Sequence, residues 1–284
     1  MKIVVTGAAG LTGSAVTRLL LDRGHEVIAG VHTRERASGV DPRAHIAVLD
    51  LGDVDAVTPV IRSCDALVHV AGIHLAEAVA RACGGGDPAR LVVVSTANAM
   101  LPQHPNAAMY LAREDRLRAA RPDLIVVRPT MIYGSLRDRN VHKVVLLAHR
   151  WRLLPVPSSG GARIQPVHYL DLAQVLVRVL DRDVGPTLAA GGPSALTLEQ
   201  CARLIFGALG MRPRLVRIPV SPALDVARVW DRVTGSRLAP RVARSEIDRV
   251  VDVGEMMRVT GISPRTFEDG LGSLISEMRA SGAL

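Results

Sequence analysis

The strongest constraint on the fold of this chain is the regular alternation of short apolar runs with segments of helical period. The runs are nearly continuous in Val, Ile, Leu and Ala, as expected of strands that are covered on both faces. They are Lys2–Thr6, Glu26–Val31, His45–Leu49, Ala66–Ala71, Leu91–Thr96 and Leu124–Arg128. Helical patterns lie between them, at Leu11–Arg23, Val54–Arg62 and Ala107–Ala120. The alternation predicts an α/β fold with a doubly wound parallel sheet and right-handed crossovers.

The rhythm changes after Arg128, where prolines and glycines interrupt the pattern. A helical pattern at Val141–Arg150 stands between Pro-marked loops, and a strand-like piece at Arg163–His168 leads into a helix over Leu170–Leu180. From Thr197 onward the pattern is helical, with Pro-rich joints. We therefore expect a dinucleotide-binding domain at residues 1–130, completed by about 163–190. Residues 131–162 and 191–284 should form a smaller, mainly helical C-terminal substrate region.

Composition excludes several classes of protein. With 284 residues and 48% hydrophobic residues, the chain can bury a sizeable core without disulfides or a structural metal. Cys64, Cys83 and Cys201 are odd in number and far apart, so they predict buried thiols instead of a zinc site or a disulfide framework. No apolar run resembles a signal peptide or a membrane span. These features predict a cytoplasmic protein with no metal and no membrane partner.

The charge of the chain favours an anionic small molecule over a nucleic acid. The formal net charge is +8, and it comes from 33 Arg and 2 Lys against 27 acidic residues. The arginines are spread along the chain, and only 3 Tyr, 2 Trp and 2 Phe are available to stack on bases. We therefore expect no nucleic-acid partner.

A glycine turn joins the first expected strand to the first expected helix. It reads Thr6-Gly7-Ala8-Ala9-Gly10-Leu11-Thr12-Gly13. Gly7 would permit the tight turn, Gly10 would let the backbone approach a pyrophosphate, and Gly13 would allow the helix to pack closely on the strand. This context predicts a Rossmann-type dinucleotide site. The alternative is that the three glycines serve only the turn.

The end of the second strand bears on which dinucleotide is bound. An acidic residue there would bind the ribose 2′-hydroxyl of NAD, whereas a basic residue accommodates the 2′-phosphate of NADP. The chain has His32, Arg34 and Arg36 after the strand and no carboxylate at the strand end. NADP(H) is therefore favoured, although NAD remains an option. The alternative is that both arginines belong to a solvated helix start in an Arg-rich chain.

Further motifs follow the glycine turn in a fixed order. They are Asp50-Leu51, Ala71-Gly72, Ser95-Thr96, Arg128-Pro129-Thr130, Tyr133-Gly134, the segment from Gln165 to Ala173, and Gly191-Gly192-Pro193. Together with the turn they resemble the extended and atypical short-chain dehydrogenase/reductases. The likeness is greatest to the NAD-dependent epimerase/dehydratase branch, which includes nucleoside-diphosphate-sugar epimerases. It covers nearly the whole chain and is specific for the superfamily, but not for the substrate.

The resemblance implies a set of cofactor-binding residues and a set of catalytic residues. The cofactor set comprises Gly7, Gly10, Leu11, Thr12, Gly13, His32, Arg34, Asp50, Leu51, Ala71, Gly72 and Pro129. Within this set, Asp50 and Leu51 would flank the adenine, and Ala71 and Gly72 would pass beneath the cofactor. Ser95 or Thr96 would polarise a substrate carbonyl, and Tyr110 would transfer the proton.

The chain departs from the family at one catalytic position. The family places a Lys four residues after the catalytic Tyr, and here that position is Glu114. A carboxylate on the same helix face as Tyr110 disfavours the phenolate, whereas Arg113 would restore some positive potential. Tyr110 is therefore either the proton donor or a plain residue of the helix surface.

Four other residues have structural and functional interpretations. We expect Asp171 to cap a helix beginning at Leu172, and His168 to be a hydrogen-bonded core residue. We expect Trp151 and Tyr133 just past the C-terminal ends of strands, where such folds bind ligands, so both would border a substrate cleft, although packing explains them equally well.

Two functions follow from these expectations. The first is an NAD(P)-dependent oxidoreductase or epimerase acting on a carbonyl or hydroxyl of a small, nucleotide-linked or simpler substrate. The second is a non-catalytic NADPH-binding sensor or accessory protein, which the missing Lys supports. The resemblance also suggests a homodimer.

Overall fold

The computed structural model describes residues 1–83, 88–138, 140–158, 162–235 and 238–284, which form two compact units. Unit 1 comprises Met1–Pro129, Tyr169–Ala190 and Asp252–Ser263. Unit 2 comprises Thr130–His168, Gly191–Val251 and Pro264–Leu284. Residues 163–168, which we expected to complete the first domain, therefore lie in unit 2, and a segment near the C-terminus returns to unit 1.

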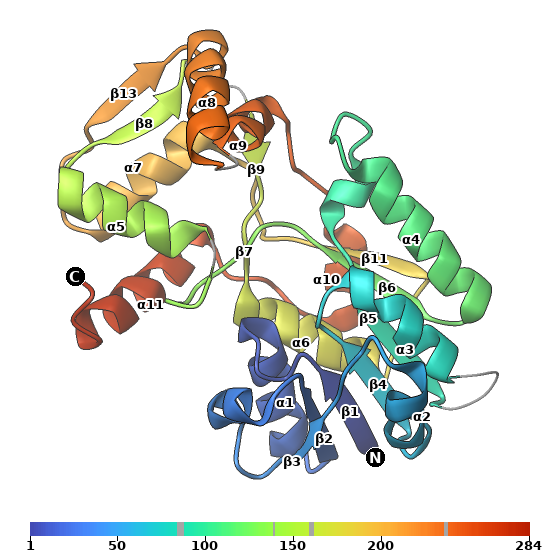
Figure 1. Ribbon diagram of the computed structural model, residues 1–284. Helices are drawn as coiled ribbons and strands as arrows, with labels where there is room; N and C mark the ends of the chain where they lie inside the picture. Colours follow the sequence, from blue (N-terminus) through green and yellow to red (C-terminus); the bar gives the residue numbers. More distant parts are fainter. Residues whose placement is uncertain (84–87, 139, 159–161, 236–237) are drawn as a thin grey trace. The chain divides into compact units, whose positions relative to one another are not determined.

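Unit 1 contains a seven-stranded parallel sheet, which confirms the predicted fold class (Figure 1). Its strands are β1 (Lys2–Thr6), β2 (Glu26–Val31), β3 (His45–Val48), β4 (Ala66–His69), β5 (Arg90–Val94), β6 (Ile125–Pro129) and β11 (Thr187–Ala190). The order is β11-β6-β5-β4-β1-β2-β3, so the chain direction across the sheet reverses between β1 and β4. β11 has only four residues, two of them alanine, and its sequence gave no strand pattern.

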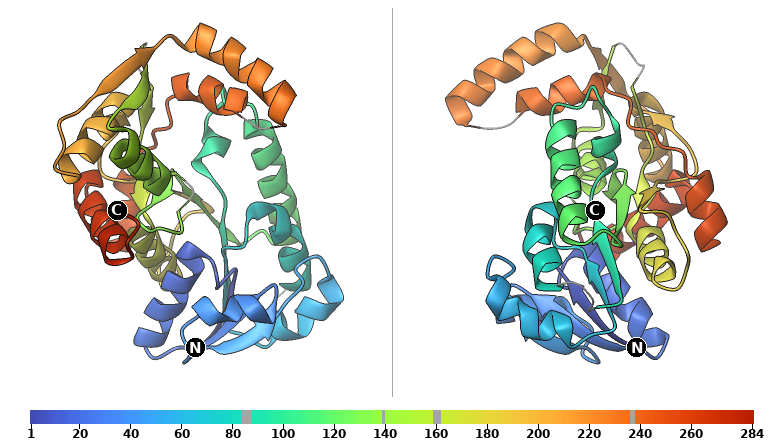
Figure 2. Two further views of the ribbon diagram at one scale, coloured as in Figure 1. Left: turned by 60° about the vertical axis from the view of Figure 1, so that its left-hand side comes forward. Right: turned by 90° about the vertical axis from the view of Figure 1, so that its right-hand side faces the viewer.

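Helices cover the sheet of unit 1 (Figure 2). They are α1 (Leu11–Asp22), α2 (Val54–Arg62), α3 (Ala76–Cys83), α4 (Ala107–Ala120), α6 (Tyr169–Val179) and α10 (Gly254–Thr260). α1 and α10 pack against α6, whereas α2, α3 and α4 form the other group. Val57, Val79 and Leu117 from this second group share a buried cluster with the strand residues Leu67 and Val126.

Unit 2 combines helices with three short strand pairs. The helices are α5 (Val141–Trp151), α7 (Leu198–Ala208), α8 (Val220–Thr234), α9 (Leu238–Ala243) and α11 (Phe267–Ala280). The pairs are β7 (Ile132–Tyr133) with β10 (Val167–His168), β9 (Arg163–Ile164) with β12 (Leu196–Thr197), and β8 (Leu154–Pro157) with β13 (Leu215–Ile218). The strand-like piece predicted at 163–168 is thus two strands, because Gln165-Pro166 interrupts the pairing.

The structure decides the interpretation of four single residues. α6 begins at Tyr169, so Asp171 is a buried residue of its first turn and does not cap a helix at Leu172. Tyr133 is 0% exposed and packs against Phe267, so it belongs to a core and not to a cleft. Trp151 ends helix α5 and follows no strand. His168 is buried edge-on against Tyr133, as expected of a core histidine.

All three cysteines are buried and free, as predicted. Burial raises the pKa of the Cys64 thiol to about 11 and those of Cys83 and Cys201 to about 12. Within the described residues, no helix has the length and apolar character needed to cross a membrane.

A buried histidine ties together the ends of β1 and β4. His69 Nδ1 lies 2.8 Å from the Thr6 hydroxyl, and its Nε2 lies 2.9 Å from the Gly72 carbonyl oxygen. Burial lowers the pKa of His69 from 6.5 to about 4. The ring is therefore neutral at pH 7, so Nε2–H donates to Gly72 and Nδ1 accepts from Thr6. This arrangement fixes the spacing between the two loops that follow the strands.

The buried histidine predicts a specific loss of stability in mild acid. Below its ordinary pKa of 6.5 the imidazole takes up a proton in the unfolded chain but stays neutral in the folded one, until the pH approaches about 4. The free energy of unfolding should therefore fall as the pH drops through this window, by at most about 1.4 kcal/mol per unit from this group. His69→Gln should show a shallower dependence between pH 6.5 and 4.5 in urea unfolding. Parallel curves for the two proteins would contradict the assignment.

Candidate functional site

The glycine turn lies where the chain direction across the sheet reverses, at the carboxyl ends of β1 and β4. Gly7 has a φ of +72°, and its N–H donates to the Gly30 carbonyl at 3.1 Å. A Cβ at Gly7 would stand 2.8 Å from the Cα of Ala71. Only glycine fits there, because both the backbone angle and the adjacent strand end exclude a side chain.

Gly10 and Gly13 occupy opposite environments. A Cβ at Gly13 would lie 2.2 Å from the Gly7 carbonyl oxygen, so this glycine allows α1 to pack closely on the turn. A Cβ at Gly10 would meet only that same oxygen, at 3.1 Å, and Gly10 is exposed. The backbone at Gly10 is therefore open to a ligand, whereas the backbone at Gly13 is enclosed by protein.

Within the described residues, helix α1 begins without a side-chain partner for its positive end. Gly10 is its N-cap residue, no side chain caps it, and its first turn contains no acidic residue. The N–H groups of a first helical turn and the helix dipole attract anions. The residues Leu11 and Thr12 begin this turn, so the arrangement suits a phosphate or pyrophosphate group.

The segment after β2 is a short 3₁₀ helix, η1 (Arg34–Gly39). His32 and Arg34 are exposed, and among the described residues Arg34 and Arg36 form no ion pair. Hydrogen bonds from its own backbone N–H and from the Thr33 hydroxyl lower the pKa of Glu35. Glu35, the first carboxylate after the strand in the sequence, is thus held by hydrogen bonds within its own segment.

The other expected cofactor residues differ in exposure. Asp50 is exposed, and one of its carboxylate oxygens accepts from the Gly52 N–H at 2.9 Å. Leu51 is buried in the core cluster next to α2. Ala71 touches the glycine turn, and Gly72 has a φ of +116°, which favours glycine. Pro129 is buried at the end of β6. The turn and the Ala71–Gly72 loop are therefore the parts that the fold brings together.

One catalytic candidate, Ser95, bonds to a buried carboxylate that extends from α4. Glu114 is 0% exposed, and one of its oxygens accepts from the Ser95 hydroxyl at 2.6 Å. Arg128 donates to it from Nε at 3.1 Å, and also from Nη2. Arg118 approaches it to 3.8 Å. The position expected to hold a lysine is thus the centre of an Arg–Glu–Ser network.

This network changes the expected influence of Glu114 on Tyr110. The charge of Glu114 is neutralised by a two-pronged arginine, so it is not an uncompensated anion on the helix face. The Ser95 hydroxyl is committed to Glu114, and the Thr96 hydroxyl caps η3 (Ala97–Met100) by accepting from the Asn98 N–H at 3.3 Å. Tyr110 is half-buried, and within the described residues its hydroxyl has no hydrogen-bond partner.

Sequence reasoning missed two residues of this region. Arg128 was noted only as part of a motif, and its pairing with Glu114 spans β6 and α4. His69 gave no signal beyond its place at the end of an apolar run. The apolar residues before Arg128 indicate that its charge is partly buried and needs an acidic partner. They do not indicate that this partner is Glu114.

Comparison with known proteins places the chain among nicotinamide-dependent proteins. The sequence model of the family described as NAD(P)H-binding matches residues 7–183. A ceramide reductase of Caulobacter vibrioides is 29% identical, over 82% of this chain and 80% of its own. A dTDP-4-dehydrorhamnose reductase of Mycobacterium tuberculosis is also 29% identical, over 78% and 80%. An Arabidopsis thaliana mitochondrial NADH dehydrogenase subunit, alpha subcomplex subunit 9, is 26% identical over 80% of this chain, which spans 62% of that protein.

Solved structures share the fold at lower identity. The protein gox2253 has a TM-score of 0.80 at 21% identity, with 99% of both chains covered. A UDP-glucuronic acid 4-epimerase from Bacillus cereus has a TM-score of 0.76 at 15% identity, covering 99% of this chain and all of its own. The sequence match extends over more than half of the chain, and it begins within the glycine turn described above. The chain therefore belongs to the NAD(P)H-binding family, among the extended reductases and epimerases of the short-chain dehydrogenase/reductase type.

Proposed function

We propose that this protein is an NADP(H)-dependent oxidoreductase that acts on a carbonyl or hydroxyl of a small substrate. The observation that carries the proposal is the open backbone of Gly10 at the uncapped N-terminus of α1, where the sheet order reverses. Ligands of doubly wound sheets bind at this switch point. Nucleotide-linked sugars are the first substrates to test, since dTDP-4-dehydrorhamnose reductase is among the relatives.

The residues for the cofactor would divide into three groups. The N–H groups of Leu11 and Thr12 would face the pyrophosphate, with Gly10 leaving room for its approach and Gly13 holding α1 against the turn. Arg34 and His32 would bind the 2′-phosphate, because both are exposed after β2. Asp50 would stand at the adenine side, with Leu51 holding its loop in the core, and Ala71, Gly72 and Pro129 would line the remaining surface. The cofactor would supply hydride chemistry, and the protein would supply orientation and a proton.

Tyr110 is the best candidate for the proton donor. The Ser95 hydroxyl donates to Glu114, the Thr96 hydroxyl accepts from the Asn98 N–H and keeps its own proton, and the Tyr110 hydroxyl is not engaged by any described residue. Ser95 donates to Glu114, so its oxygen keeps only acceptor capacity and cannot also donate to a carbonyl. We assign proton transfer to Tyr110, the position that the family resemblance implies, and a positioning role to Ser95, with Thr96 as the second candidate donor.

The remaining assignments concern the whole molecule. Unit 1 would bind the cofactor and unit 2 would supply the substrate region. A homodimer is proposed from the family resemblance alone. A cytoplasmic location fits the three buried free thiols.

A second candidate function is cofactor binding without turnover. It is favoured by the Glu114–Arg128 pair, which occupies the position of the family lysine with a buried, fully paired carboxylate. One relative is named as a subunit of a respiratory complex and not as a reductase. Binding of NADPH with no oxidation of it by a carbonyl panel, including sugar nucleotides, would favour this candidate.

The two glycines predict separable defects. Gly10→Val should weaken NADPH binding at least about tenfold with little change in stability. The methyl groups of the valine would occupy the side of the turn that faces the pyrophosphate. Gly13→Ala should instead destabilise the fold by about 1–3 kcal/mol, because its Cβ meets backbone. Calorimetric titration and thermal unfolding measure the two effects. Wild-type affinity in Gly10→Val would remove the glycine turn from cofactor binding.

The basic segment after β2 predicts a cofactor preference. NADPH should bind more tightly than NADH, and Arg34→Ala should reduce the ratio of affinities about tenfold, through loss of a charge-assisted hydrogen bond to the 2′-phosphate. Arg23→Ala, which removes an exposed arginine after α1, is the matched control and should keep the ratio. Equal affinities for both cofactors in the wild-type protein would refute the preference.

The assignment of Tyr110 predicts a loss of turnover without a loss of cofactor affinity. Tyr110→Phe should lower kcat by about 100-fold or more while leaving NADPH affinity unchanged, as expected when a proton donor is removed. Tyr169→Phe removes a hydroxyl at the start of α6 and should retain activity. A fully active Tyr110→Phe enzyme would exclude Tyr110 and direct attention to Thr96 or a bound water.

A further inference from the structure

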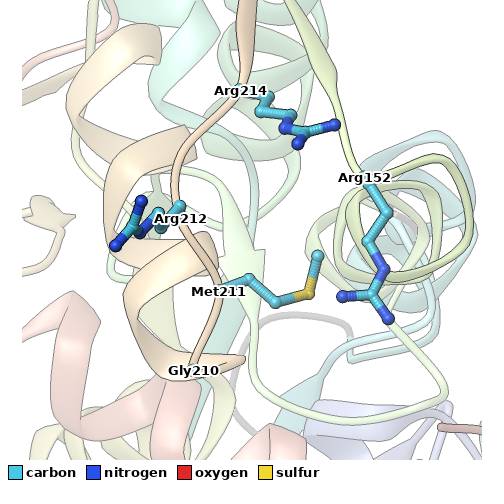
Figure 3. A pocket seen from close by; sticks show the side chains of 5 residues that line it. All are labelled: Arg152, Gly210, Met211, Arg212 and Arg214. Atoms are coloured by element: carbon cyan, nitrogen blue, oxygen red, sulfur yellow. The ribbon is translucent and has the colours of Figure 1, made fainter.

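A pocket within unit 2 is lined by three arginines that the proposed function does not use. Its volume is about 440 Å³, and its walls are Arg152, Gly210, Met211, Arg212 and Arg214. Figure 3 shows Arg152 at the end of α5 and Arg214 on the approach to β13. Met211 points toward the Arg152 side chain, and Arg212 points away on the other side of the loop. Arg152 and Arg214 therefore extend toward the same space.

These arginines differ from other exposed arginines of unit 2. Arg163, Arg203 and Arg217 each pair with a carboxylate at 3.3 Å or less. Within the part of the chain that the structure describes, no side chain forms a hydrogen bond or ion pair with the guanidinium groups around the pocket. Neighbouring unpaired guanidinium groups repel one another, so an anion between them would be stabilising.

Arg152 is held in a conformation that is unfavourable for its side chain. Its φ is +59°, which makes it the one non-glycine residue with a positive φ among the described residues. It ends helix α5 in the left-handed region, where glycine is usual. The chain uses glycine at the corresponding turn after α7, where Gly210 has a φ of +71°. A strained arginine where glycine would serve better indicates that its side chain has a use.

The local charge and size select the kind of ligand. α5 and α7 both end near the pocket, and each helix C-terminus contributes roughly half a negative charge. The guanidinium charges of Arg152 and Arg214 exceed this without Arg212, so the pocket is net positive. Arginine presents paired N–H donors that match phosphate oxygens, and Met211 offers an apolar contact for a carbon skeleton. We propose that this pocket binds the phosphoryl group of a small phosphorylated molecule.

This site is independent of the glycine turn. All of its lining residues lie in unit 2, and none belongs to the set assigned to the cofactor or to catalysis. The inference therefore goes beyond the proposed oxidoreductase function and can fail or succeed separately from it.

Calorimetric titration with inorganic pyrophosphate, at low salt and saturating NADPH, tests the proposal. Arg152→Gly and Arg214→Gln should each weaken binding about tenfold or more. Arg279→Gln removes an exposed charge from α11, outside the pocket, and should bind as the wild type does. Without ligand, Arg152→Gly should also raise the Tm by about 2 °C, because glycine relieves the strain. Gain of stability with loss of binding in one variant is the expected signature.

Two further measurements identify the ligand and separate this pocket from the glycine turn. Ribose 5-phosphate should bind more tightly than inorganic phosphate if the carbon skeleton contacts Met211, and equal binding would mean that the free anion is the ligand. Gly10→Val should keep its pyrophosphate affinity, whether or not it has lost NADPH. The proposal is overturned if Arg152→Gly binds pyrophosphate normally, if Arg279→Gln is equally weakened, or if Gly10→Val alone abolishes binding.

Discussion

Close contact between backbone and backbone at the start of α1 is the constraint on which the candidate site depends. The turn after β1 must pass within contact distance of the loop after β4, and α1 must then sit directly on the turn. Neither approach leaves room for a Cβ at Gly7 or Gly13. His69 maintains the same spacing from within, since it accepts from Thr6 and donates to Gly72. The result is a rigid helix N-terminus with one open residue, Gly10, and this combination suits an anion.

The second organising interaction is the buried pair of Glu114 and Arg128. Removing two charges from water is costly, and the pair survives burial because the Ser95 hydroxyl and several guanidinium N–H groups satisfy the carboxylate. Breaking such a pair is far more destabilising than replacing both members, so the network fixes α4 against β5 and β6. It also restricts the chemistry, because a serine that donates to a carboxylate is unavailable as a donor to a substrate. The same interaction therefore stabilises unit 1 and removes the Ser95 hydroxyl from the candidate proton donors, whereas Tyr110 and Thr96 keep their protons.

The sequence predicted unit 1 well because its signals are local. Val54–Arg62 and Ala107–Ala120 are helices with the predicted bounds, and Lys2–Thr6 and Glu26–Val31 are strands with the predicted bounds. The distinct roles expected of Gly7 and Gly13 follow from spacing along one turn, and the geometry agrees with them. Unit 2 was less predictable, because its two-residue strands and Pro-containing β8 gain their pairing from distant segments and carry little pattern of their own.

The sequence by itself determined the α/β class, the parallel sheet, the family and the turn that could hold a dinucleotide, since each depends on residues close together in the chain. Only the tertiary structure decided which partners the buried polar groups have. Glu114 was expected to act on Tyr110, four residues away, yet it pairs with Arg128 from another element. A cleft and a core were both open for Tyr133, which fills a core, and the strain of Arg152 became visible only in its backbone angle. Burial and pairing depend on what the fold brings near a residue, and spacing along the chain does not encode that.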